Sequence, residues 1–250
     1  GEISGTIDEL IRHSTSKLSH IHFVSNNQAK KRLIQMGELE ESIYTIGSPD
    51  LDIMFSNRLP SLTEAKSYYE VEFEKFAIVM FHPVTTESNE IKFYVENLVN
   101  ALLQDDYNYL IVYPNNDLGS QFILDAYKKF EDHDRFKIYP SLRFEYFLTL
   151  LKNADFIIGN SSAGIREAPY YGLPVINIGS RQKRRSINTD IFNVNYDKDQ
   201  ILTALKSIKT KENAEIKKEY GDGNSAQLFL DSLSNDKIWT LNHQKQFRDI

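Results

Sequence analysis

The sequence of 250 residues contains no cysteine. This absence excludes disulfide bonds, thiolate nucleophiles, iron–sulfur clusters and every zinc site that depends on cysteine. The sequence also lacks an apolar run near the roughly 20 residues that a membrane-spanning helix needs, and it shows no signal-peptide pattern. We therefore expect a soluble, cytoplasmic protein that does not bind a membrane.

An excess of positive charge is missing as well. The chain has 29 basic and 35 acidic side chains, and its net charge of −6 argues against nucleic-acid binding. Hydrophobic residues make up 41% and aromatic residues 12% of the chain, so a substantial core can form, which argues against wholesale disorder. A length of 250 residues allows one large domain or two small ones.

The first part of the chain predicts alternating helices and strands. Thr6 and Glu9 have the spacing of a capping box, which predicts a helix start there. The chain begins at Gly1 without an initiator methionine, and we interpret it as a piece of a longer protein. Hydrophobic periodicity predicts a helix, a strand, a second helix and a second strand, in that order, over Asp8–Ser19, His20–Val24, Asn27–Met36 and Ser42–Ile46.

From about residue 55 onward, short apolar strands alternate with helical stretches. This pattern is typical of an α/β fold in which helices cover both faces of a parallel sheet. Strands are expected over Phe76–Phe81, Tyr109–Tyr113, Phe136–Tyr139, Phe156–Ile158, Val175–Ile178 and Phe192–Val194. Helices are expected over Glu90–Leu103, Gln121–Phe130, Phe144–Lys152, Ala163–Tyr171, Asp199–Ser207, Ala214–Tyr220 and Ala226–Leu233.

Polar residues gather directly after these strands. In open α/β sheets, ligands bind outside the carboxyl ends of the strands. The sequence therefore predicts a site for a polar ligand there, and we interpret that ligand as phosphorylated. The five segments that follow the first five of these strands are His82–Glu87, Pro114–Ser120, Pro140–Arg143, Gly159–Gly164 and Gly179–Arg185.

Residues 159–167 have two interpretations. Small and hydroxyl residues between a strand and a helix can present backbone N–H groups to a phosphate at the helix N-terminus. The same residue types are also ordinary helix N-caps. The segment matches neither the Rossmann GxGxxG pattern nor the Walker P-loop, so neither dinucleotide nor ATP chemistry is indicated.

His82 and the cations at residues 181–185 are similarly ambiguous. An imidazole at a strand end could move protons near neutral pH, donate to a phosphate or be purely structural. Arg181 and Lys183–Arg185 could reach a pyrophosphate or form a solvated surface, and Arg181, nearest the strand, is the best candidate. His20 and His22 have no acidic or cysteine cluster nearby and predict no metal site.

Other polar residues have simple structural explanations when the sequence is considered alone. The helix macrodipole explains Asp8 and Glu9 at a helix start, and composition gives Glu2 no role. Tyr220–Asn224 is best explained as a helix stop followed by a turn.

An ordered set of short motifs nevertheless runs from residue 1 to about residue 230. It comprises Gly1–Glu9, Ile11–His13, Lys17–His20, Gly47–Pro49, His82–Thr86, Pro114-Asn115, Gly159–Ser162, Arg166-Glu167, Arg181-Gln182 and Tyr220–Asn224. In order and spacing, this set closely resembles the hydrolysing UDP-N-acetylglucosamine 2-epimerases.

The resemblance implies a fold and a division into domains. It implies an α/β fold of the glycosyltransferase-B type, with Rossmann-like parallel sheets, helices on both faces and the UDP-sugar between two halves. Residues 1–54 would be a remnant of the N-terminal domain, 55–225 the UDP-binding domain and 226–250 a C-terminal helix and tail. Family members are longer at the amino end, so the first part of that domain would be absent.

The resemblance also implies a reaction. In this family a base removes the proton at C2 of the sugar while UDP leaves C1, and water then adds to the resulting 2-acetamidoglucal to give N-acetylmannosamine. Carboxylates beside the sugar, and cations or hydrogen-bond donors beside the diphosphate, suit this chemistry, which needs no metal and no cofactor. Position by position, Glu2, Asp8 and His82 would be catalytic, while Arg12 and His13 would lie on the sugar side.

The remaining site residues would bind UDP. The phosphates would contact serine hydroxyls, the histidine and an arginine, while other residues would contact the ribose, the nucleotide and the uracil edge. Ser161, Ser162, His82 and Arg181 would contact the phosphates. Glu167 would contact the ribose, Asn115 would line the nucleotide site, and the backbone near Leu142 would contact the uracil edge.

His82–Thr86 differs from the His-Arg-Arg-Glu stretch usual in the non-hydrolysing members, which favours the hydrolysing branch. Family members supply sialic-acid-like pathways and form homodimers or homotetramers. UDP-N-acetylglucosamine is the expected substrate. The alternatives are a UDP-2,4-diacetamido-trideoxy-glucose substrate of legionaminic acid synthesis, a non-hydrolysing epimerase, an inactive UDP-binding fragment and a glycosyltransferase of the same fold.

Overall fold

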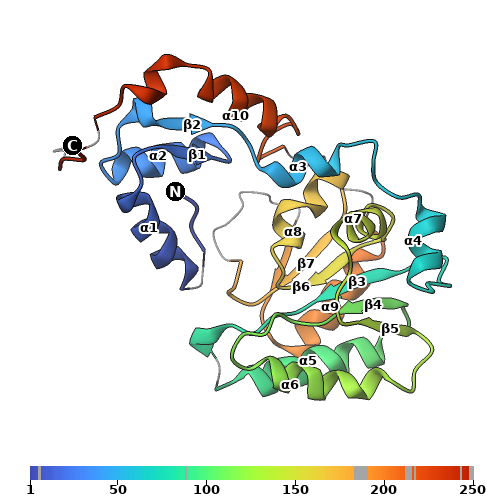
Figure 1. Cartoon of the computed structure of the whole chain (residues 1–250). Coiled ribbons are helices and arrows are strands. Elements are labelled where there is room, and N and C mark those ends of the chain that lie inside the picture. The colour runs from blue at the N-terminus through green and yellow to red at the C-terminus, as the bar shows by residue number, and fades with distance from the viewer. Residues whose placement is uncertain are drawn as a thin grey trace. The chain divides into compact units, whose positions relative to one another are not determined.

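A computed structural model describes residues 1–4, 7–87, 89–182, 191–211, 216, 218–242 and 244–247 (Figure 1). By its contacts, the chain forms two compact units. Unit 1 comprises Gly1–Arg58 together with Lys218–Ile250, and unit 2 comprises Leu59–Lys217. The division at residues 54 and 225 that the family resemblance implies remains a prediction.

Unit 2 is built around a parallel sheet of six strands. The strands lie in the order β5-β4-β3-β6-β7-β8, so the order of connection reverses between β3 and β6. Most positions in these strands are buried, because helices cover both faces. The strands are β3 (Ala77–Met80), β4 (Tyr109–Val112), β5 (Phe136–Tyr139), β6 (Ile157–Gly159), β7 (Val175–Ile178) and β8 (Ile191–Val194).

Figure 1 shows α5, α6 and α9 on one face of this sheet and α7 and α8 on the other. Leu98 of α5, Ile123 of α6 and Leu205 of α9 are fully buried in the main core, against alternate strand residues such as Val79 and Ile111. The helices are α4 (Leu62–Tyr68), α5 (Ile91–Gln104), α6 (Ser120–Tyr127), α7 (Phe144–Lys152), α8 (Ala163–Arg166) and α9 (Lys198–Ile208). Single 3-10 turns lie at Thr85–Glu87, Lys128–Phe130 and Ala168–Tyr171.

Unit 1 has a smaller core around two parallel strands, β1 (His22–Val24) and β2 (Ile43–Thr45). Leu33 of α2 packs against Val24 and Ile43, whereas the Phe23 ring meets Phe229 of α10 at a centroid distance of 4.7 Å. Helices from both ends of the chain therefore sandwich this sheet. Its helices are α1 (Asp8–Leu18), α2 (Asn27–Gln35), α3 (Pro49–Met54) and α10 (Ser225–Leu233), with 3-10 turns at Glu40–Ser42 and Asp236–Trp239.

The predicted parallel α/β pattern is confirmed in unit 2, and most element bounds agree within two residues. The helix predicted over Ala163–Tyr171 is wrong as a single helix, because Pro169 has no N–H and the chain changes from α to 3-10 geometry there. The helix predicted over Ala214–Tyr220 is also wrong in its described part, since residues 216 and 218–220 are not helical.

Two further differences concern helix starts. Thr6 lies outside the described residues, and the Glu9 carboxylate accepts a hydrogen bond from the Ser4 N–H at 2.9 Å. A complete capping box occurs instead at Ser61 and Glu64, where it begins a helix that the prediction missed. Within the described part of the chain, no helix has the length and apolar character needed to cross a membrane.

Candidate active site

The candidate site of unit 2 lies where the sheet reverses its order of connection. In such folds the ligand crevice forms outside the carboxyl ends of the two strands at the reversal. These strands are β3 and β6. His82 follows β3, and Asn160 follows β6 directly.

The Asn160 side chain joins the ends of these two strands. Its Oδ1 accepts a hydrogen bond from the His82 N–H at 2.7 Å, and its Nδ2 donates to the His82 carbonyl at 2.8 Å. Asn160 is fully buried, and its own N–H donates to the Met80 carbonyl at 3.0 Å. Both backbone groups of His82 are thus paired with one carboxamide.

The His82 imidazole is buried and points to the neighbouring strand end. Nδ1 accepts a hydrogen bond from the Asn115 N–H at 3.1 Å, which leaves the proton of the neutral ring on Nε2. Burial, and then the positive charge of Arg181, lower the pKa of His82 to about 3. At neutral pH the ring is therefore uncharged and can donate a hydrogen bond through Nε2.

Two side chains after β7 meet the backbone of Asn160. Arg181 Nη1 and Gln182 Nε2 donate to the Asn160 carbonyl at 3.1 Å and 2.8 Å. Hydrogen bonds therefore link the carboxyl ends of four neighbouring strands. The residues that make these bonds are Asn115 after β4, His82 after β3, Asn160 after β6, and Arg181 and Gln182 after β7. We call these five residues the strand-end network.

Gly159 gives the chain the path that this network requires. Its φ is +139°, and a Cβ at this position would lie 2.0 Å from the Met80 carbonyl oxygen. Any other residue would clash with the backbone of β3. Glycine therefore lets β6 approach β3 closely, at the position just before Asn160.

Ser161 and Ser162 connect β6 to α8, a helix of four residues. Ser161 Oγ accepts a hydrogen bond from the Ala163 N–H at 3.3 Å, as an ordinary turn residue does. Glu167 at the end of α8 is buried. Burial, and then the negative charge of Glu167, raise the pKa of Tyr171 to about 12.

One more sequence-predicted residue of unit 2 lies in a loop at the same edge of the sheet. Leu142 is half-buried in the loop after β5, where the Arg143 N–H donates to Tyr69 Oη at 2.8 Å. Lys183, Arg184 and Arg185 lie outside the described residues.

Glu2 and Asp8 belong to unit 1. Glu2 is half-buried. Asp8 is the exposed first residue of α1, a position where the helix dipole favours a negatively charged side chain. Arg12 Nη2 donates to Ser4 Oγ at 2.6 Å, and His13 Nε2 lies 3.5 Å from Glu9 Oε1. The structure thus brings His82, Asn115 and Arg181 together in unit 2 and holds Glu2, Asp8, Arg12 and His13 in the other unit.

Sequence reasoning missed the roles of Asn160, Gln182 and Glu87. The Glu87 carboxylate accepts hydrogen bonds from Ser180 Oγ and, at 2.9 Å, from Tyr196 Oη, so it holds the loop that carries Arg181. An asparagine directly after a buried strand was the available signal for Asn160. Glu87 is separated in the sequence from Ser180 by 93 residues and from Tyr196 by 109 residues, so no local pattern indicates these contacts.

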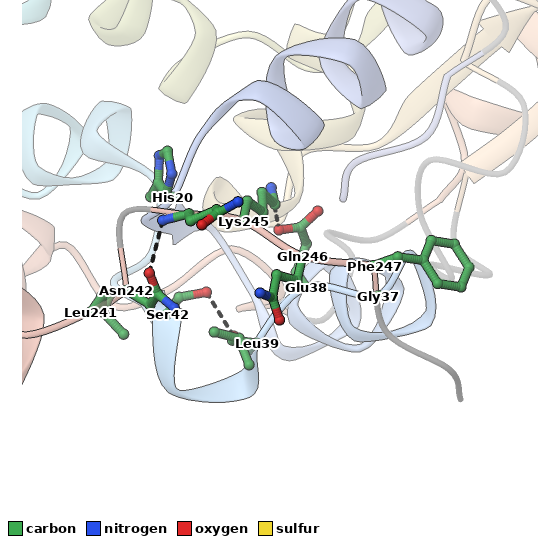
Figure 2. A pocket seen from close by; sticks show the side chains of 11 residues that line it. His20, Gly37, Glu38, Leu39, Ser42, Leu241, Asn242, Lys245, Gln246 and Phe247 are labelled. Carbon is green, nitrogen blue, oxygen red and sulfur yellow. Dashed lines mark hydrogen bonds and ion pairs between the residues drawn. The ribbon is translucent and has the colours of Figure 1, made fainter.

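A cavity of about 240 Å³ lies in unit 1 (Figure 2). It is lined by residues that include His20, Glu38, Ser42, Lys245 and Phe247. Its buried charge is compensated, because Lys245 and Lys17 lie 2.5 Å and 2.9 Å from the Glu38 carboxylate. Burial opposes the charge of Glu38, but hydrogen bonds from Lys245 and Lys17 outweigh it and lower the pKa.

Among the described residues, no group of three histidine, aspartate or glutamate side chains could hold a metal ion. His22 lies instead 3.1 Å from the Glu38 carboxylate. Burial, opposed by the hydrogen bond with Glu38, lowers the pKa of His22.

Comparison with known proteins shows that this chain is similar to sugar-nucleotide 2-epimerases. A family model described as UDP-N-acetylglucosamine 2-epimerase matches residues 1–234. A UDP-N-acetylglucosamine 2-epimerase of Neisseria meningitidis is 46% identical over 253 aligned positions, which cover 100% of this chain and 67% of the relative. A UDP-N,N'-diacetylbacillosamine 2-epimerase (hydrolyzing) of Legionella pneumophila is 36% identical and covers 91% of this chain and 60% of the relative.

Solved structures agree on the fold. The crystal structure of Methanocaldococcus jannaschii UDP-GlcNAc 2-epimerase in complex with UDP-GlcNAc and UDP matches with a TM-score of 0.72 at 18% identity. The match covers 90% of this chain and 64% of that chain, so the present chain spans less than two thirds of it. The expected fold class, α/β of the glycosyltransferase-B type, is confirmed, and this chain belongs to the UDP-N-acetylglucosamine 2-epimerase family.

Proposed function

We propose that this protein is a hydrolysing UDP-N-acetylglucosamine 2-epimerase. It would convert UDP-N-acetylglucosamine and water into N-acetylmannosamine and UDP. The C2–H and C1–O bonds break in the first step to give 2-acetamidoglucal and UDP. Water then adds across the new double bond, with its hydroxyl at C1 and a proton on the opposite face of C2.

The strand-end network carries this proposal. It places a cation, Arg181, and a neutral imidazole, His82, at the position where α/β sheets bind ligands. A departing diphosphate needs cations and hydrogen-bond donors that are already oriented. The strand-end network supplies the cation from half-buried Arg181 and a hydrogen-bond donor from buried His82.

His82 would act as a donor through Nε2. Its low pKa, caused by burial and then by Arg181, makes the free ring a poor carrier of charge at neutral pH. A hydrogen bond from Nε2 to the diphosphate would stabilise the negative charge that develops as the C1–O bond breaks. Ser161, Ser162, Asn115, Glu167 and the backbone near Leu142 would complete the UDP site, in roles that the family resemblance implies.

Glu2 and Asp8 would supply the acid–base chemistry at the sugar. Carboxylates are suited to removing the C2 proton and to returning a proton on the other face. Asp8 is the exposed first residue of α1, so its carboxylate is accessible from solvent. Their catalytic roles rest on the resemblance.

The choice of substrate rests on one observation, and the choice of branch rests on two. The Neisseria relative, which is named for UDP-N-acetylglucosamine, has the higher identity of the two relatives compared, 46% against 36%. The Legionella relative is named as hydrolysing, and His82–Thr86 departs from the usual non-hydrolysing motif. A hydrolase of a diacetamido-trideoxy sugar is therefore the second candidate. A cytoplasmic location, a homodimer or homotetramer and a place in sialic acid synthesis are further parts of the proposal.

The test is proton NMR of the chain with UDP-N-acetylglucosamine in deuterated buffer. We expect free UDP and N-acetylmannosamine with deuterium at C2. UDP-N-acetylmannosamine without free UDP would instead establish a non-hydrolysing epimerase. UDP binding without either product would leave a UDP-binding module and contradict the proposed activity of this chain.

A further inference from the structure

We infer that Asn160 is a positioning residue that sets the orientation of both His82 and Arg181. The inference rests on the proposed UDP-sugar site, and it assigns a role to a side chain that touches no substrate atom in the proposal. It follows from the hydrogen bonds that join Asn160 to the two neighbouring strand ends.

The first step concerns the backbone of His82. The β3–β6 ladder ends at Met80 and Gly159, and one further bond joins the Asn160 N–H to the Met80 carbonyl. Beyond this point the Asn160 side chain replaces the missing partner strand, because it pairs with both the N–H and the carbonyl of His82. A carboxamide offers a donor and an acceptor at the spacing that these two backbone groups require.

The second step concerns the imidazole. Since its backbone is held at both groups, the His82 ring can point only where the local rotamers allow, and there Nδ1 meets the Asn115 N–H at 3.1 Å. The backbone clamp therefore helps to fix the tautomer, with the proton on Nε2. Without the clamp, two polar groups of a residue that is 5% exposed would lose their partner.

The third step concerns Arg181. Because the Asn160 side chain takes over the pairing with β3, its backbone carbonyl can accept hydrogen bonds from Arg181 and Gln182. These bonds hold two long side chains against the end of β6. One buried residue thus couples the proposed cation and the proposed donor of the diphosphate site.

The variant N160D tests this inference because it is nearly isosteric. A carboxylate can still accept from the His82 N–H but repels the His82 carbonyl. The control is N108A, since Asn108 Nδ2 also bridges neighbouring strands of this sheet by donating to the Lys75 carbonyl at 3.0 Å. That contact lies at the amino ends of β3 and β4.

Two measurements separate positioning from stability. Long-range proton–¹⁵N NMR of the free chain reports the tautomer of His82, whose signal is assigned by its loss in H82Q. We expect a single tautomer with the proton on Nε2 in wild type and N108A, and a mixture in N160D. Calorimetry with UDP should show a dissociation constant at least about tenfold higher in N160D and unchanged in N108A.

Where the wild-type chain turns over substrate, kcat of N160D should fall more than KM rises. A wild-type tautomer together with wild-type UDP affinity in folded N160D would overturn the inference. If N160D does not fold, N160S, whose hydroxyl can keep one of the two bonds, provides the same comparison. If wild type binds no UDP, the proposed function fails, and the tautomer measurement alone decides the role of Asn160.

Discussion

His82 is the residue whose ionisation links stability to pH. An unfolded histidine has a pKa of 6.5, whereas burial and then Arg181 lower the pKa in the fold to about 3. Between these values the unfolded chain binds more protons, so the free energy of unfolding decreases as pH falls from about 6.5 towards 3.

We expect wild type to lose about 2 kcal/mol more stability than H82Q between about pH 7.5 and pH 5. Urea denaturation at both pH values measures this difference. His22 has a lowered pKa in both proteins, so its effect cancels in the comparison. Equal losses in the two proteins would contradict a buried, neutral His82.

We expect the positive charge of Arg181 to make a large electrostatic contribution to UDP affinity. R181A removes a cation from beside the proposed diphosphate, and we expect the UDP dissociation constant to rise about tenfold. The wild-type affinity should also weaken as salt increases, and less so in R181A. Calorimetry measures both effects.

K129A is the control for lost charge, since Lys129 pairs with Glu96 away from the strand-end network. Its UDP affinity should equal that of wild type. An R181A affinity as high as that of K129A would remove Arg181 from the site.

At the scale of elements, the β6–α8 connection depends on one glycine. G159A would place a Cβ 2.0 Å from the Met80 carbonyl oxygen at a φ of +139°, so we expect it to cost about 3 kcal/mol or more. In G164A the nearest atom is the Val175 Cγ1 methyl at 2.9 Å, which can shift. Urea denaturation should therefore show a smaller loss in G164A, and equal losses would contradict the close approach of β6 to β3.

The sequence predicted these elements well where hydrophobic periodicity was clear. The strands over Tyr109–Val112 and Val175–Ile178 were found because both faces are buried and, apart from Asn177, their residues are apolar. The helix α3 over Pro49–Met54 was missed because six residues are too few to establish a helical period. At the site, the positions of His82 and Arg181 after strands were predictable.

The hydrogen bonds of the site were not predictable in the same way. The Asn160 side chain contacts a residue 78 positions earlier, and the Gln182 side chain reaches Asn160 across 22 positions. Such contacts depend on strand order, which no local pattern in this sequence specifies. The two units were not separable by composition either, because unit 1 combines both ends of the chain.

At the scale of the whole molecule, Lys245 attaches the C-terminal segment to the first helix. Its Nζ lies 2.5 Å from Glu38 Oε2 and donates to the carbonyls of Ser16, Lys17 and Ser19 at 2.9 Å, 3.0 Å and 2.7 Å. It therefore neutralises a buried carboxylate and caps the carboxyl end of α1. This attachment matters because α1 has no buried residue of its own.

We expect K245A to destabilise unit 1 by about 2 kcal/mol, since among the described residues Glu38 would keep Lys17 and His22 as its partners. The single tryptophan, Trp239, lies in unit 1, so its fluorescence during urea denaturation reports on this loss. UDP affinity should stay unchanged, because the strand-end network lies in unit 2. A K245A transition that coincides with wild type would contradict this role.

The central claim is that the strand-end network binds the diphosphate of UDP. A crystal structure of the chain with UDP tests it most directly. The account predicts diphosphate oxygens within hydrogen-bond distance of His82 Nε2 and the Arg181 guanidinium, with Asn160 still paired to the His82 backbone. UDP bound elsewhere, with the strand-end network unoccupied at saturating UDP, would contradict it.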